Sequence, residues 1–289
     1  MSLLKDTPID TKAILSKKIE TESGIFHRLN SSYTSFSNRT CSNPTVWQQM
    51  SINYFFNLLT TNRLFFKRIS AFTARDERPL DFYEATYFKD TGTPQDTMLH
   101  KIIQDFTDTV YISCWYHSDN LTDIVFKEYA KGSVGVAIGT DVNTLLNKLV
   151  ENADSDSPHS DELFYGDTVY LGDLPSKTRI LTDSSDLITP LFVKSENHND
   201  DREFRLAYIK NSYYLRGERF SSTTISPDKR REDNLNANIG STKELIKQVA
   251  VRSDDPCTLA LTKYLLEQFI TTTATVNTEQ IDGFTVIKL

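Results

Sequence analysis

Cysteine is scarce in this sequence, and the spacing of the few that are present excludes two classes of site. Only three occur in 289 residues: Cys41, Cys114 and Cys257. No two of them form a Cys-x-x-Cys pair, so neither a structural zinc site nor a dithiol redox motif is indicated. Their odd number and wide separation argue against disulfides, which fits a reducing compartment. We therefore expect a cytoplasmic protein.

Long apolar runs and internal repeats are also missing. Residues 1–22 are polar and have neither an apolar core nor a small-residue cleavage site, so we do not expect a signal peptide. No run approaches the length that crosses a bilayer, so no membrane partner is expected. The net charge of −7 argues against a protein whose main role is to bind nucleic acid. Nucleic acid is retained only as a target of an activity.

What the sequence does contain is enough apolar surface for one large core. It is 38% hydrophobic and 25% charged, as in ordinary soluble globular proteins. Strand and helix patterns are interspersed without strict alternation. We predict an α+β fold with a mixed or antiparallel central sheet and flanking helices. Residues 1–22 are expected to form an N-terminal arm, and residues 23–289 a single α+β domain.

Hydrophobic periodicity defines the expected elements. Strands are predicted at 25–29, 64–66, 110–115, 134–138, 163–171, 203–209 and 284–287. Helices are predicted at 45–59, 94–106, 120–131, 142–149, 242–251 and 256–270. The polar run 226–241 is predicted to be a mobile excursion.

The most informative motif is the run from Asp201 to Arg205. On a strand, Asp201, Glu203 and Arg205 share one face, whereas Phe204 and Leu206 point to the other. Two carboxylates and a guanidinium on one face can serve chemistry at a sugar or a phosphate. The same residues can instead form a charge ladder between adjacent strands. Both interpretations stay open from the sequence.

Several segments occur in an order that suggests a family. They are a Cys-Trp strand at 114–115, a Phe-x-x-Tyr helix at 126–129 followed by Gly-Val-Ala-Ile, and Phe-Val-Lys at 192–194 before the acid-x-Glu strand. Over residues 25–270 this order resembles the bacterial family catalogued as domain of unknown function 2971. The chain has Phe126 and Phe204 where that family usually has Trp, and Asp201 where it has Glu. The family implies no settled activity.

A second resemblance is to enzymes that transfer ADP-ribose from NAD. In the sequences of these enzymes, a strand carrying His or Arg comes first and a loop with aromatic and Ser/Thr residues follows. A strand with an acid-x-Glu motif comes late in the chain. The resemblance implies that His27 or Arg28 holds the NAD diphosphate or ribose. It implies that Ser70 and Phe72 line a nicotinamide pocket, and that Glu203 accepts a hydrogen bond from the nicotinamide ribose.

The implied chemistry is coherent. Departure of nicotinamide leaves an oxocarbenium-like centre, which a fixed carboxylate stabilises. Asp201 would orient the acceptor or water, and Arg205 would join the NAD-binding residues. We therefore predict an NAD-dependent ADP-ribosyltransferase or NAD glycohydrolase, acting as a toxin or anti-phage effector. The expected partners are a small nucleotide ligand, with NAD as substrate, and a protein partner or antitoxin.

Two other functions remain open. One is a metal-dependent phosphodiesterase or nuclease using Asp201, Glu203 and a third carboxylate within metal-ligand reach. The other is a non-enzymatic module that senses a ligand or binds a partner, which predicts an exposed charge ladder with no cleft. An NAD site predicts an aromatic-lined cleft beside Glu203 and His27.

Overall fold

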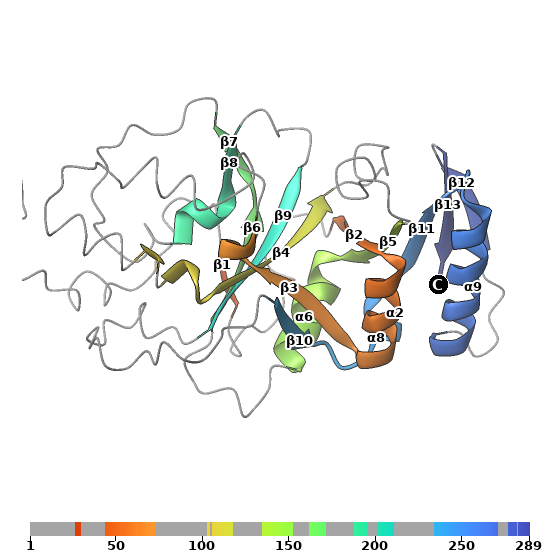
Figure 1. Ribbon diagram of the computed structural model, residues 1–289, viewed down its shortest axis with the longest axis horizontal. Helices are drawn as coiled ribbons and strands as arrows, with labels where there is room; N and C mark the ends of the chain where they lie inside the picture. Colours follow the sequence, from red (N-terminus) through yellow and green to blue (C-terminus); the bar gives the residue numbers. More distant parts are fainter. Residues whose placement is uncertain are drawn as a thin grey trace, which may run out of the picture.

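The protein is an α+β structure built on one large antiparallel sheet (Figure 1). This computed structural model describes residues 27–29, 44–72, 103–104, 106–117, 135–152, 162–171, 188–195, 202–210, 234–270, 277–281 and 283–289. Helices pack against the sheet, and α9 contacts α2, β5 and β11. The predicted fold class is confirmed, with the sheet antiparallel throughout.

Eleven strands of the described part of the chain form this sheet. The main path runs β1-β6-β9-β4-β2-β5-β11-β13-β12, and β3 pairs with both β4 and β10. The strands are β1 (His27–Leu29), β2 (Thr45–Ser51), β3 (Arg63–Arg68), β4 (Val110–His117), β5 (Gly135–Asp141), β6 (Glu162–Asp167), β9 (Glu203–Ile209), β10 (Asn234–Asn238), β11 (Gln248–Arg252), β12 (Asn277–Ile281) and β13 (Phe284–Lys288). A separate parallel pair joins β7 (Val169–Leu171) to β8 (Val193–Ser195).

The sheet forks at β4. Two strands share one edge of β4. Tyr111 and Ile112, near its start, pair with β3, and Tyr116 and His117, at its end, pair with β2. The opposite edge of β4 pairs along its length with β9. Three branches of the sheet therefore meet at β4.

Four α-helices lie in the described residues, and local sequence signals define where three of them begin. They are α2 (Ile52–Thr61), α6 (Val142–Glu151), α8 (Thr242–Leu245) and α9 (Pro256–Phe269); η2 (Ile69–Ala71) and η4 (Thr189–Phe192) are short 3₁₀ turns. Ser51, Asp141 and Asp255 precede α2, α6 and α9, and each side chain accepts a hydrogen bond from a backbone N–H of the first turn. These N-caps satisfy donors that the helix itself leaves unpaired.

The two faces of the sheet are packed differently. On the face covered by α2, α6 and α9, called here the helical face, buried residues form one continuous apolar cluster. On the opposite face, called here the split face, the apolar residues fall into two separate clusters. The first, the β6–β9 cluster, includes Ile112, Phe164, Leu191, Ala207 and Ile209. The second, the β2–β13 cluster, includes Trp47, Tyr116, Ala137, Ala250 and Val286.

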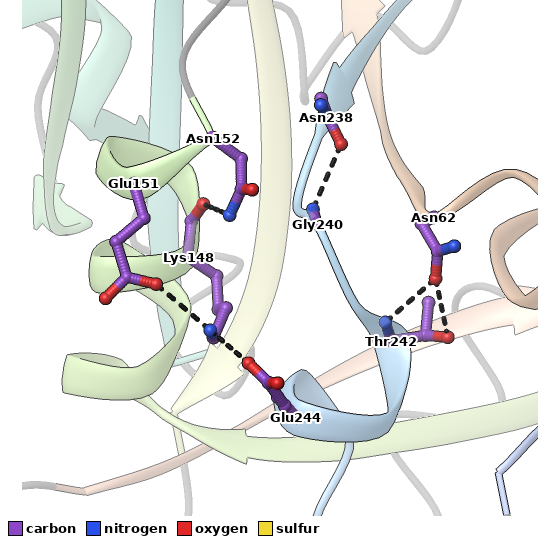
Figure 2. A network of polar contacts seen from close by, with 8 residues as sticks. All are labelled: Asn62, Lys148, Glu151, Asn152, Asn238, Gly240, Thr242 and Glu244. Carbon is purple, nitrogen blue, oxygen red and sulfur yellow. Dashed lines mark hydrogen bonds and ion pairs between the residues drawn. The ribbon is translucent and has the colours of Figure 1, made fainter.

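A polar network fixes the connection from β10 to α8 (Figure 2). Lys148 on α6 binds Glu244 on α8 and Glu151 on its own helix, and these hydrogen bonds raise the pKa of Lys148 above its usual 10.5. Asn62, the left-handed C-cap of α2, accepts hydrogen bonds from the backbone and the hydroxyl of Thr242, both at 3.0 Å. The chain thus enters α8 held by both α2 and α6.

Two predicted helices are wrong in part. Residues 45–51 form β2 rather than the start of a helix, because this segment pairs along its length with β5, and the helix begins only after the Ser51 cap. Residues 242–251 were predicted as one helix, but α8 ends at Leu245 and β11 follows. Val249, Ala250 and Val251 are inserted there between β5 and β13.

Other expectations have mixed outcomes. The strands at 110–115, 134–138 and 203–209 lie in one sheet, as predicted. The predicted strand at 163–171 is two strands, β6 and β7, and residues 234–238 of the predicted excursion form β10 against β3. The arm at 1–22, the helix at 120–131 and most of the helix at 94–106 lie outside the described residues. Within the described part, no helix is long and apolar enough to cross a membrane.

Candidate functional site

Glu203 begins β9, a strand flanked on both sides by β6 and β4. It belongs to a buried charged cluster that also contains Lys194 and Arg205. The exposed fractions are 4% for Glu203, 3% for Arg205 and 5% for Lys194. Charged side chains are rarely this buried unless they are paired, so the contacts within the cluster decide what it can do.

Both oxygens of the Glu203 carboxylate contact a cation. Arg205 reaches Oε2 with Nη2 at 2.7 Å and with Nε at 2.8 Å, and Lys194 reaches Oε1 with Nζ at 3.4 Å. Arg205 also donates from Nη1 to the carbonyl oxygen of Leu191 at 2.7 Å. The guanidinium is therefore fixed tightly, whereas the lysine contact is longer.

The backbone around Glu203 is fixed by the β7–β8 pair. The backbone N–H of Glu203 donates to the Tyr170 hydroxyl at 2.9 Å, and its carbonyl oxygen accepts from the Thr168 N–H at 2.8 Å. Tyr170 pairs with Lys194 across β7 and β8, so the same small sheet carries the lysine. Arg202, just before Glu203, has a φ of +40°, a conformation that non-glycine residues rarely adopt. Residues held in such rarely populated conformations concentrate at functional sites.

Strand register places aromatic residues beside the charged cluster. Glu203 lies opposite Tyr116 on β4, and Tyr116 lies opposite Trp47 on β2. Directly paired residues of antiparallel strands share a face, so these three form one row on the split face. Arg205 lies opposite Cys114, which is half-buried against the β6–β9 cluster. The charged cluster therefore lies where the two apolar clusters of the split face are interrupted.

The burial of the ladder answers one question that the sequence left open. Glu203 and Arg205 face away from Phe204 and Leu206, as the alternation predicts, because the latter two belong to the helical-face cluster. The charged face is buried too, so the interpretation as an exposed charge ladder is wrong. The β7–β8 pair and η4 cover this end of the sheet and explain the burial. Asp201 lies outside the described residues.

His27 and Arg28 lie two strands away from Glu203. On β1, Arg28 pairs with Phe164 of β6, which pairs with Ala207 of β9. Ala207 is four positions along β9 from Glu203, so strand spacings put the Cα atoms of Arg28 and Glu203 about 16 Å apart. His27 occupies the neighbouring row, opposite Tyr165. The backbone of β1 is thus on the same sheet but not adjacent to the charged cluster.

Ser70 and Phe72 differ in their surroundings. Ser70 is exposed in η2, whereas Phe72 packs against the β6–β9 cluster, with Lys67 Nζ 4.8 Å from its ring centroid. Leu191, which accepts the hydrogen bond from Arg205, belongs to the same cluster. Phe72 and Arg205 therefore contact one apolar cluster on the split face, whereas Ser70 is exposed.

Comparison with known proteins identifies no relative. No protein-family model, no curated protein and no solved structure matches the chain. The resemblances to the two families named above therefore stay predictions. Among the described residues, no group of three or more His, Cys, Asp or Glu side chains is placed to hold a metal ion.

Three residues of the site escaped the sequence prediction. Lys194 was noted only as part of the Phe-Val-Lys segment, although a lysine directly after Leu-Phe-Val also suggests a buried, paired charge. Tyr116 and Trp47 carry no such signal. They come beside Glu203 through strand register alone, which a single sequence does not reveal.

Proposed function

We propose that this protein binds NAD in the cytoplasm and cleaves the bond between nicotinamide and ribose, with Glu203 as the catalytic carboxylate. The observation that supports this is the buried Lys194–Glu203–Arg205 cluster, in which Glu203 lies opposite Tyr116 of the neighbouring strand β4. It combines a carboxylate for the sugar, two cations for phosphate groups and an aromatic neighbour for a ring. ADP-ribose is passed to an acceptor or to water.

The cations and the carboxylate have separate roles in this proposal. Arginine binds phosphate oxygens through paired donors, and lysine binds them as a point charge. The incoming diphosphate competes with Glu203 for Arg205 and Lys194. The carboxylate released in this way turns to the nicotinamide ribose, where it accepts a hydrogen bond and stabilises positive charge at C1′.

The reaction balances without an added oxidant or metal. The C1′–N bond breaks and its electron pair leaves with neutral nicotinamide. An oxygen of the acceptor or of water then bonds to C1′ and releases its proton. The transition state resembles that of glycoside cleavage, where a nearby carboxylate has the same role. Asp201 would orient the acceptor, and Arg28 or His27 would bind the more distant part of the dinucleotide.

The biological setting belongs to the same proposal. An enzyme that consumes NAD is harmful to its own cell, so the protein would act as a toxin or anti-phage effector held in check by a protein partner. The resemblance to the family catalogued as domain of unknown function 2971 would then extend this activity to other members.

Nicotinamide release from NAD by the purified protein tests the proposal. Glu203→Gln should lower the rate by about 100-fold or more, because it removes the charge that faces the oxocarbenium centre. Glu244→Gln is the matched control, since it also removes a carboxylate bound to a lysine but lies on α8. It should leave the rate unchanged.

Calorimetry with NAD separates binding from chemistry. Lys194→Met should weaken NAD binding about tenfold or more, because hydrogen bonds to charged groups contribute about 1.5–3 kcal/mol. This variant retains the Arg205–Glu203 pair and should stay folded. Unaltered NAD binding by Lys194→Met, together with an unaltered rate in Glu203→Gln, would refute the proposed site.

A further inference from the structure

Strands β3 and β10 turn one side to the core and the other side away from it. Leu64 and Phe66 of β3 are 1% and 0% exposed in the apolar cluster of the helical face. Leu235 and Ala237 of β10 pack against the same cluster. Because side chains alternate along a strand, the residues between and beside these four point away from the core. This outward side is called here the β3–β10 face.

Three cross-strand pairs make up the β3–β10 face. Each pair joins a cation or an aromatic ring on β3 to an asparagine on β10: Arg63 with Asn238, Phe65 with Asn236, and Lys67 with Asn234. Directly paired residues of antiparallel strands share a face, so these side chains form one ladder. Arg63, Asn234 and Asn236 are exposed, and the other three are partly exposed. The ladder is therefore accessible to a partner.

A second ring enlarges the aromatic part of this face. Tyr54 of α2 is 49% exposed, and its ring centroid lies 5.0 Å from that of Phe65, with the two planes inclined at 45°. Arg63 and Lys67 stand two positions to either side of Phe65, which is about 7 Å along the strand. Single exposed rings are common on protein surfaces, whereas here two rings are in contact and a cation lies on each side.

The composition of these elements favours an anionic partner that forms hydrogen bonds. α2, β3 and β10 contain no Asp or Glu, although the chain has 39 of them. Asparagine is depleted in strands, yet it occupies every outward position of β10. Its amide both donates and accepts hydrogen bonds, which suits the edges of nucleic-acid bases. Asn238 also stabilises the turn after β10, because its side-chain oxygen accepts from the Gly240 N–H at 3.0 Å (Figure 2).

We propose that the β3–β10 face binds single-stranded nucleic acid. Bases stack on Tyr54 and Phe65, and Arg63 and Lys67 neutralise the neighbouring phosphates. The Asn236 amide hydrogen-bonds to a base edge. A single strand suits a strand surface of this kind, because its unstacked bases offer their rings and edges directly. With two cations, the binding is weak and depends on salt, which agrees with the net charge of −7. It requires neither NAD nor Glu203.

Fluorescence anisotropy with labelled oligouridine and oligothymidine tests the stacking. Oligomers of about 12 nucleotides lie within the usual range of single-strand sites. Tyr54→Ala should weaken binding about tenfold, because stacking of one base on an aromatic ring contributes on that order. Tyr54→Phe keeps the ring and should retain the affinity. Phe56→Ala is the matched control, since Phe56 is 48% exposed on the same helix but contacts Phe269 instead of Phe65. It should leave binding unchanged.

Salt dependence tests the two cations separately from the rings. Each phosphate neutralised on a single strand contributes about −0.7 to the slope of the logarithm of the association constant against the logarithm of the salt concentration. The wild-type slope should be about −1.4, and Arg63→Gln should reduce its magnitude by about 0.7. Lys263→Gln removes an exposed positive charge from α9 and should leave the slope unchanged.

The outcomes that would overturn this inference are distinct from those that concern NAD. Equal losses in Tyr54→Ala and Phe56→Ala, or equally tight binding of a DNA duplex, would mean that bases do not stack on this face. No binding of either oligonucleotide at low salt would overturn the proposal and would leave the face to a protein partner. Lys194→Met should bind both oligonucleotides as the wild type does. A loss in that variant would place the strand at the charged cluster instead.

Discussion

The charged cluster predicts an unequal effect of removing its members. Glu203→Gln removes the carboxylate between two buried cations, whereas Lys194→Met leaves Glu203 bound to Arg205 through both of its short contacts. Removing one partner of a buried pair typically costs about 3–5 kcal/mol, because the remaining charge stays buried. We expect a loss of this size for Glu203→Gln. For Lys194→Met we expect a loss of about 1 kcal/mol, because methionine retains an apolar stem of similar length and no new charge is isolated.

The double variant Lys194→Met/Glu203→Gln makes the prediction sharper. Replacing the lysine removes one of the two cations that Glu203→Gln leaves facing each other. The double variant should therefore be more stable than the sum of the single effects implies, by about 0.5–3 kcal/mol. Arg205 would keep its hydrogen bond to the Leu191 carbonyl in every variant.

Urea unfolding followed by circular dichroism measures these differences. The slope of the free energy against urea concentration should be the same in all variants, so that the midpoints report stability alone. Equal losses in Glu203→Gln and Lys194→Met would refute the reasoning, because they would mean that the 3.4 Å contact contributes as much as the two shorter ones. Strict additivity in the double variant would show that the two cations do not interact through Glu203.

Two further predictions concern packing and a helix cap. Gly139→Ala should lower the free energy of unfolding by about 1–3 kcal/mol, because the added methyl group overlaps the Trp47 ring. In a Trp47→Phe background the same change should be neutral or stabilising. Equal costs in both backgrounds would contradict the contact between Gly139 and the Trp47 ring. Asp255→Ala should cost about 0.5–2 kcal/mol because α9 loses its N-cap. Two hydrogen bonds lower the pKa of Asp255 below 3.8: the larger effect comes from the Thr258 hydroxyl and the smaller from the Thr258 backbone N–H. The stabilisation from the ionised Asp255 side chain should therefore be complete above pH 3.8, and it should be lost as the pH falls through the lower folded-state pKa. Urea midpoints of wild type and Asp255→Asn across this range test the sign, and a difference that grows on acidification would contradict it.

Local patterns predicted the elements that depend on local interactions. The alternation of charged and apolar residues identified β9 and the two faces of its side chains, and apolar residues at helical spacing identified α6 at 142–149. Both signals act within a few residues, so one sequence is enough to reveal them.

The errors occurred where distant pairing outweighed local spacing. Trp47 and Met50 have helical spacing, but residues 45–51 gain a full ladder of hydrogen bonds with β5 and form a strand. The short strand β11 was likewise taken for helix, because its pairing with β5 and β13 joins segments far apart in the chain. Tertiary context commonly overrides spacing in this way.

The candidate site was predictable only for its central residues. Glu203 and Arg205 were identified from the acid-x-Glu motif, and the structure brings them into direct contact. Lys194 joins them through the β7–β8 pair, which positions a residue nine places earlier in the chain. The aromatic neighbours depend on register across β9, β4 and β2, and no pattern within one strand encodes register.

Among the described strands, β4 is the one that joins the three branches of the sheet. Deleting β4 would divide the sheet into three pieces: β1-β6-β9, β3-β10 and β2-β5-β11-β13-β12. Glu203 belongs to the first piece and Trp47 to the third, so β4 is the strand that links them in the sheet. The apolar cluster of the helical face also spans the three pieces, because it includes Val46 of β2, Leu64 of β3 and Phe204 of β9. A substitution that weakens the pairing of β4 would therefore act on all three pieces at once and would leave this apolar packing to hold them together.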